Sequence, residues 1–95
     1  MSAPISSTTR FRHAPDAAWR VVDDQAVVIT SATQKMRVLN GVGTRVWQEC
    51  EGKTFGELVA LLQGEYDADP ARIEEDARVF VEDLLGRGMI ERIDP

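Results

Sequence analysis

The chain has few of the residues from which catalytic centres, metal sites and disulfide frameworks are built. It contains one cysteine, Cys50, and one histidine, His13, among 95 residues. A single thiol excludes an intramolecular disulfide, and a single histidine without paired cysteines is too little for a zinc site. The sequence also lacks a glycine-rich phosphate loop and a grouping of nucleophile, base and oxyanion donor. We therefore expect a protein that is not an enzyme and that has no metal or cofactor.

Basic residues and long apolar runs are also scarce. The 11 lysine and arginine residues are outnumbered by 16 aspartate and glutamate residues, which gives a formal net charge of −5 and a pI near 4.7. An acidic surface repels phosphate backbones and anionic lipid headgroups. No apolar run has the length of a signal peptide or of a membrane span. The sequence thus predicts a cytoplasmic protein without a nucleic-acid or membrane partner.

The residues that are present predict one small folded domain. A hydrophobic fraction of 43% with 28% charged residues is typical of an ordinary globular chain. Residues 1–17 begin with serine, threonine, alanine and proline and predict a flexible tail, which leaves residues 18–95 as the domain. Strand-forming stretches follow at Trp19–Val22, Ala26–Thr30 and Lys35–Leu39, with polar turn residues between them. They predict a small antiparallel three-stranded sheet whose last strand has a free edge.

Three helices are predicted after the sheet. The first extends from about Gly41 to Cys50, with Asn40 as its N-cap. The second begins at Thr54, which with Glu57 matches the capping-box pattern, and the third has Pro70 in its first position. Residues 89–93 form either a short closing strand or an irregular tail. This order of elements predicts an α+β, winged-helix-like fold.

The third predicted helix carries two stripes of side chains. One has the spacing of a core-facing surface and contains Ile73, Ala77, Phe80 and Leu84. The adjacent stripe is mostly polar and contains Arg72, Asp76, Val79 and Asp83. This second stripe is either a solvated face with one stray valine or one wall of a groove, and periodicity alone favours the solvated face.

Several short motifs occur in a fixed order between Trp19 and Ile93. They are Leu39-Asn40 with Gly43 and Trp47, the link Gly52-Lys53-Thr54, Tyr66-Asp67 before Pro70, and Asp76, Phe80, Leu84 and Gly88. In order and spacing the chain resembles the PqqD family of small peptide chaperones, also called RiPP recognition elements. One departure is Met36-Arg37-Val38, which lacks the aromatic residue that some lasso-peptide members place in this strand.

The resemblance implies a module that binds the leader of a ribosomally synthesised precursor peptide and presents it to a maturation enzyme. That enzyme is a radical S-adenosylmethionine protein, or a leader peptidase and cyclase. In the family the leader adds as a strand to the edge of the third strand and rests against the third helix, so that backbone hydrogen bonds give affinity and side pockets give specificity. The implied peptide-binding residues are Gln34, Lys35, Met36, Arg37, Val38 and Leu39 in the strand and Asp76, Val79, Phe80 and Asp83 in the helix.

Some alternatives remain open at this point. Lys35 and Arg37 either pair with leader carboxylates or protect the edge strand from aggregation. A winged-helix DNA-binding regulator would insert the third helix into the major groove, although the acidic run Glu74-Glu75-Asp76 would meet phosphates with like charge. A structural subunit of an enzyme complex would have the same fold without a peptide. An exposed edge strand also allows a homodimer through strand pairing or exchange.

Overall fold

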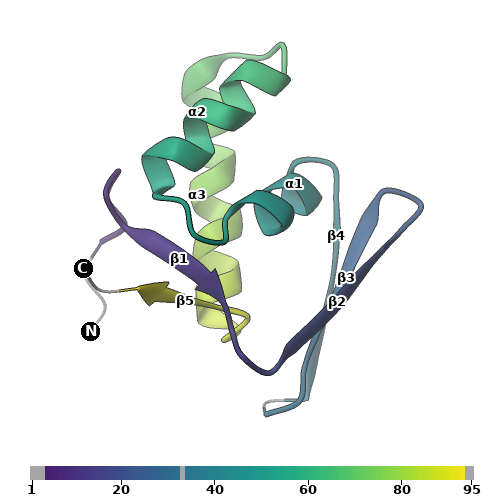
Figure 1. Ribbon diagram of the computed structural model, residues 1–95. Coiled ribbons are helices and arrows are strands. Elements are labelled where there is room, and N and C mark those ends of the chain that lie inside the picture. Colours follow the sequence, from purple (N-terminus) through teal and green to yellow (C-terminus); the bar gives the residue numbers. More distant parts are fainter. Residues whose placement is uncertain (1–3, 33, 94–95) are drawn as a thin grey trace.

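The protein is described here by a computed structural model that covers residues 4–32 and 34–93 (Figure 1). The strands that precede the helices are β1 (Arg10–His13), β2 (Ala17–Val22), β3 (Gln25–Thr30) and β4 (Lys35–Asn40). They are followed by α1 (Val42–Glu49), α2 (Phe55–Glu65), α3 (Pro70–Gly86) and β5 (Ile90–Ile93). The expected α+β class, with an antiparallel three-stranded sheet followed by three helices, is confirmed.

The three-stranded sheet has the order β2-β3-β4, so β3 is central and β2 and β4 are its edges. Both pairings are antiparallel and register Ala26 with Val21 on one side and with Leu39 on the other. The β2–β3 hairpin closes through Asp23 and Asp24, which both have positive φ angles (51° and 64°). Such a two-residue turn matches the twist of the flanking strands, and aspartate tolerates the left-handed conformation.

A second, two-stranded sheet corrects the prediction of a flexible tail over residues 1–17. β1 pairs antiparallel with β5, and Phe11 in β1 is fully buried. Ile5 is buried as well. Backbone hydrogen bonds join the segment before β1 to the start of α2, and in one of them Gly56 N donates to Ser7 O at 2.9 Å. The serine and threonine content suggested a tail, whereas burial of two apolar side chains holds residues 4–17 on the domain. Residues 1–3 lie outside the described part.

The first helix begins one residue later than predicted, with Gly41 and not Asn40 as its N-cap. Asn40 is still part of β4, where it is registered with Gln25, and this pairing keeps its backbone extended. Gly41 then turns the chain with φ 54° and ψ −126°, a conformation that glycine adopts at little steric cost. The end of the edge strand is therefore fixed by a glycine turn.

The other two helix starts match the sequence. Thr54 N donates to Glu57 Oε1 at 2.8 Å and Glu57 N donates to Thr54 Oγ1 at 3.1 Å, which completes the capping box of α2. Asp69 accepts a hydrogen bond from Ala71 N ahead of Pro70 in the first turn of α3. Residues 90–93 form β5, so the closing strand, and not the irregular tail, is observed.

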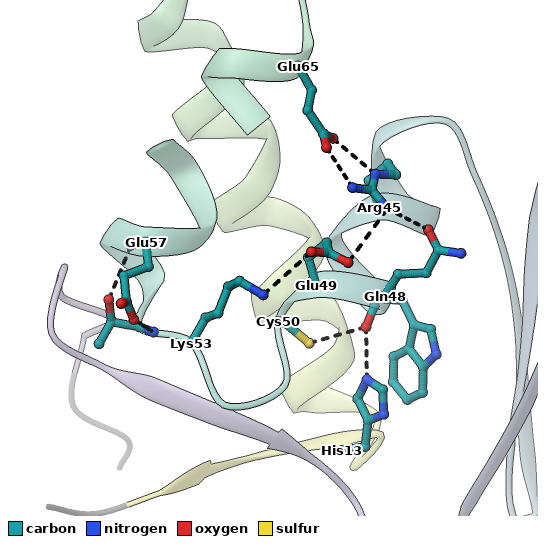
Figure 2. A network of polar contacts seen from close by, with 10 residues as sticks. His13, Arg45, Gln48, Glu49, Cys50, Lys53, Glu57 and Glu65 are labelled. Atoms are coloured by element: carbon teal, nitrogen blue, oxygen red, sulfur yellow. Dashed lines mark hydrogen bonds and ion pairs between the residues drawn. The ribbon is translucent and has the colours of Figure 1, made fainter. Parts of the chain in front are cut away.

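The hydrophobic core lies between the helices, the β1–β5 pair and one face of the larger sheet. Trp47 of α1 is fully buried, and the ring of His13 stacks on it with the ring centroids 3.8 Å apart. His13 Nε2 lies 2.8 Å from Trp47 O, while Nδ1 lies 3.0 Å from Glu51 Oε2. Figure 2 shows this ring beneath α1. The only histidine is thus a packing residue that joins β1 to α1.

Candidate functional site

β4 presents different side chains on its two faces. Leu39 is buried and Arg37 reaches α3, so the face that contains Lys35, Arg37 and Leu39 is turned toward the helices. Met36 and Val38 lie on the opposite face, where their side chains are 61% and 43% exposed. Within the described residues β4 pairs only with β3, so its other edge is unpaired.

The backbone groups on this unpaired edge include those of Met36 and Val38. Thr44 Oγ1 accepts a hydrogen bond from Ala26 N at 3.3 Å and donates one to Leu39 O at 2.9 Å. Ala26 of β3 and Leu39 of β4 are directly opposite each other in the sheet. Leu39 therefore directs its backbone toward β3. Because successive residues of an antiparallel strand direct their N–H and C=O groups to opposite sides, those of Met36 and Val38 face away from β3.

α3 lies beside this edge, and the ion pair between Arg37 and Asp83 joins the two elements. We call the surface formed by the edge of β4 and by Asp76, Val79 and Asp83 of α3 the candidate groove. Asp76, Val79 and Asp83 follow one another at helical spacing on α3, and Val79 is 58% exposed although it is apolar. The Phe80 ring packs against Gly43, where an added Cβ would come within 2.7 Å of Phe80 Cε1. The groove wall on α3 thus has an exposed valine between two carboxylates, over a ring held by α1.

Arg37 and Asp83 connect β4 to α3 across the candidate groove. Arg37 Nε donates to Asp83 Oδ2 at 3.1 Å, and Arg37 Nη1 donates to Val38 O at 2.9 Å. Arg87 Nε donates to the same carboxylate at 3.0 and 3.1 Å. Partial burial of Asp83 acts to raise its pKa, but the hydrogen bonds from the two guanidinium groups outweigh this and hold the pKa below its usual value.

The structure brings some of the predicted site residues together and separates others. Arg37 and Asp83 are in direct contact, and Val79 is exposed beside them. Leu39 is a core residue with 1% exposure, so its side chain is unavailable to a ligand. Gln34 and Lys35 are exposed at the hairpin end of β4. Sequence reasoning missed Arg87, although its place four residues after Asp83 on a helix was a usable signal.

Other ion pairs lie away from the candidate groove, around α1 and its neighbours. Arg45 of α1 reaches Glu65 at the end of α2, and Lys53 reaches Glu49, as Figure 2 shows. Burial raises the pKa of the Cys50 thiol to about 12, so the thiol stays protonated and is a poor nucleophile. Among residues 4–32 and 34–93 no group of His, Cys, Asp and Glu side chains could hold a metal ion. Nor does this part of the chain contain a helix that could cross a membrane.

The family model described as "Coenzyme PQQ synthesis protein D (PqqD)" matches residues 25–90, which include the candidate groove and all three helices of the described part. The chain belongs to the PqqD family. The resemblance seen in the motifs is thereby confirmed. A search of curated proteins found no match.

Two solved structures have the fold of this PqqD-family chain. One is TbiB1 in complex with the TbiA(beta) leader peptide, with 27% identity and a TM-score of 0.79, covering 88% of this chain and 99% of that one. The other is a lasso peptide synthetase B1 complexed with the leader peptide, with 22% identity and a TM-score of 0.75, covering 86% of this chain and 98% of that one. The match covers almost the whole of both of those chains, and each was solved with a leader peptide.

Proposed function

We propose that this PqqD-family protein binds the leader of a ribosomally synthesised precursor peptide as an added strand on β4 and presents it to a maturation enzyme. The observation that carries this proposal is the unpaired edge of β4 opposite an exposed valine on α3. TbiB1, which shares the fold and 27% of aligned residues, was solved with its leader peptide.

The groove supplies both parts of strand recognition. Backbone groups of Met36 and Val38 are directed at the position of an added strand, and they give affinity that depends little on sequence. Val79 and the half-buried Phe80 offer apolar contact on the α3 side, where alternate leader side chains would point. A leader without structure of its own loses conformational entropy on docking, so these side-chain contacts decide which peptides bind.

The proposed partner enzyme supplies the chemistry. It belongs to the radical S-adenosylmethionine class or is a leader peptidase and cyclase, and it acts in the cytoplasm, where a ribosomal precursor is made. A DNA-binding role is less consistent with the surface, since Glu74 and Glu75 are exposed in the first half of α3. A gel shift at low salt with an unrelated duplex should accordingly show no complex.

A pair of proline variants tests the added strand. Val38→Pro removes an N–H that faces the free edge of β4, whereas Val21→Pro removes one from the edge of β2, because Val21 is registered with the β4-directed Ala26. The probe is the fluorescein-labelled leader of a precursor peptide sought among the neighbouring open reading frames, and its binding is followed by fluorescence anisotropy. Val38→Pro should weaken binding roughly tenfold and Val21→Pro should not. Equal affinities in the two variants would refute strand addition at β4, and no binding by the unmodified protein would refute the function.

A further inference from the structure

Asp83 is the one carboxylate of the groove that two guanidinium groups share. Arg37 approaches it from β4 and Arg87 from the C-cap of α3, at N–O distances of 3.1 and 3.0 Å. Two positive charges face one negative charge, which leaves a local excess of one positive charge. This excess lies in a chain whose net charge is −5 and beside the edge that we propose as the leader site.

The guanidinium groups also retain unused hydrogen-bond donors. Arg37 employs Nε and Nη1, and Arg87 employs only Nε, so Arg37 Nη2 and both Nη atoms of Arg87 have no partner among the described residues. The three side chains are about one third exposed, between 31% and 39%. A planar fork of this kind matches a carboxylate in geometry and charge.

Arg37 has a second contact that an added strand must displace. Its Nη1 donates to Val38 O, the acceptor that faces the free edge. A leader strand requires that acceptor for its own N–H. In the free protein Arg37 therefore covers one of the backbone groups on which docking depends. The two roles considered for this residue, protection of the edge strand and contact with the leader, then correspond to two conformations of one side chain.

Resting on the proposed function, we propose that Arg37 and Arg87, aligned by the Asp83 carboxylate that they share, form a receptor for one acidic side chain of the leader. When this carboxylate binds, Arg37 releases Val38 O to the leader backbone. Peptides without the acidic side chain leave Arg37 on the edge and dock weakly. The acidic residue thus opens the edge as well as contributing a contact.

The geometry also fixes where this residue lies in the leader. A side chain that points to the same face as Arg37 from the neighbouring strand has its Cβ about 5 Å away. β4 leads up to α1 while α3 descends to β5, so Val79 lies one helical turn from Asp83 toward the Leu39 end of β4 (Figure 1). One helical turn is about 5.4 Å, close to the repeat of two strand residues. The leader should carry an apolar residue two positions from its acidic residue.

A random dodecapeptide phage library is the probe that tests this inference. Selection on the unmodified protein should enrich peptides with Asp or Glu two positions from an apolar residue, and selection on Arg37→Met or Arg87→Met should lose the acidic residue while keeping the apolar one. Arg20→Met is the matched control, because this substitution removes the same charge and Arg20 lies exposed on the outer face of β2. Enriched peptides without acidic residues would overturn the receptor and leave leader binding intact. Failure to enrich any peptide would overturn both.

Affinities measured on one selected peptide give the second readout. Replacing its Glu by Gln should weaken binding to the unmodified protein and to Arg20→Met roughly tenfold, the value of one charged hydrogen bond. In Arg37→Met and Arg87→Met the same replacement should have no effect. If all four proteins discriminate Glu from Gln equally, the receptor lies elsewhere. Thermal unfolding of each variant checks that loss of discrimination does not reflect loss of the fold.

Discussion

The helical half of the molecule, which consists of α1, α2 and α3 with β1 and β5, differs from the β2–β3–β4 sheet in how completely its apolar residues are buried. In the helical half Phe11, Trp47 and Leu58 are buried completely and β1 and β5 close the structure. The sheet buries one face and leaves Ile29 and Met36 of the other face 47% and 61% exposed. The first half accounts for stability by burial, whereas the second keeps an unpaired edge beside an exposed valine. Burial in the helical half therefore accounts for the fold, and we propose that recognition occurs at the sheet.

The difference extends to the charged residues. In the helical half the ion pair between Arg45 and Glu65 spans two helices that are packed together, and its loss would affect mainly their alignment. Across the groove the pair between Arg37 and Asp83 connects β4 to α3, where few other contacts are made. The first kind of pair supports packing, and the second lies at the place that we propose for the leader.

The largest expected effect tests the boundary of the helical half. Phe11→Ala removes a fully buried ring from β1 and should lower the free energy of unfolding by about 3–5 kcal/mol. Met36→Ala, on the exposed face of the sheet, should change it by about 0.5 kcal/mol or less. Urea denaturation followed by circular dichroism compares the two. Similar midpoints would mean that the N-terminal segment is the tail predicted from sequence.

A second prediction concerns the contact between α1 and α3 beneath the candidate groove. Gly43→Ala places a Cβ 2.7 Å from Phe80 Cε1, whereas Gly64→Ala meets no heavy atom within 4 Å. Overpacking should make the first variant about 1–3 kcal/mol less stable than the second, which gains helix propensity. The displaced Phe80 ring should also weaken leader binding in Gly43→Ala alone. A leader affinity unchanged in both variants would show that Phe80 does not contribute to the groove.

A smaller effect on stability alone is expected at the capping box. Thr54→Ala removes the acceptor for Glu57 N and should lower the unfolding free energy by about 1 kcal/mol. The variant should bind the leader as the unmodified protein does, because α2 does not border the groove. Parallel denaturation and anisotropy measurements check both statements, and a loss of affinity would link the helical half to recognition.

The smallest effect is the pH dependence contributed by Asp83. Its pKa is held below the ordinary value of 3.8, so its ion pairs stabilise the folded state above that pH and are lost as the pH falls through the lower folded pKa. Asp83→Asn should therefore flatten the acid limb of stability below about pH 4 and leave stability at pH 7 less changed than Phe11→Ala does. Thermal melts between pH 2.5 and 7 make the comparison, and superimposable acid limbs would contradict it.

The sequence predicted the fold well where the structure depends on residues that are close together in the chain. The capping box at Thr54, the start of α3 at Pro70 and the strand pattern of β3 each depend on neighbours in sequence. The pairing of β1 with β5 depends on residues about 80 positions apart, so the composition of the first segment pointed to a tail. Asn40 is a favourable cap by type, but its pairing with Gln25 outweighed that preference.

The candidate site was predictable in place but less so in detail. Family motifs located the strand and the helix, and helical spacing put Val79 and Asp83 on one stripe. The hydrogen bond of the Thr44 hydroxyl shows which backbone groups of β4 face the free edge. The contact of Arg37 with Val38 O shows that this side chain binds the edge as well as Asp83. Neither contact has a sequence signature, because both join residues through backbone atoms.

The central claim is that β4, and not β2, receives the leader. Amide hydrogen exchange with and without the leader measures this directly, because an added strand protects the N–H groups that face it. We predict that the amides of Met36 and Val38 exchange more slowly in the complex, while exchange of the Val21 amide on the opposite edge is unchanged. Protection of Val21 with unchanged exchange at Met36 and Val38 would contradict it.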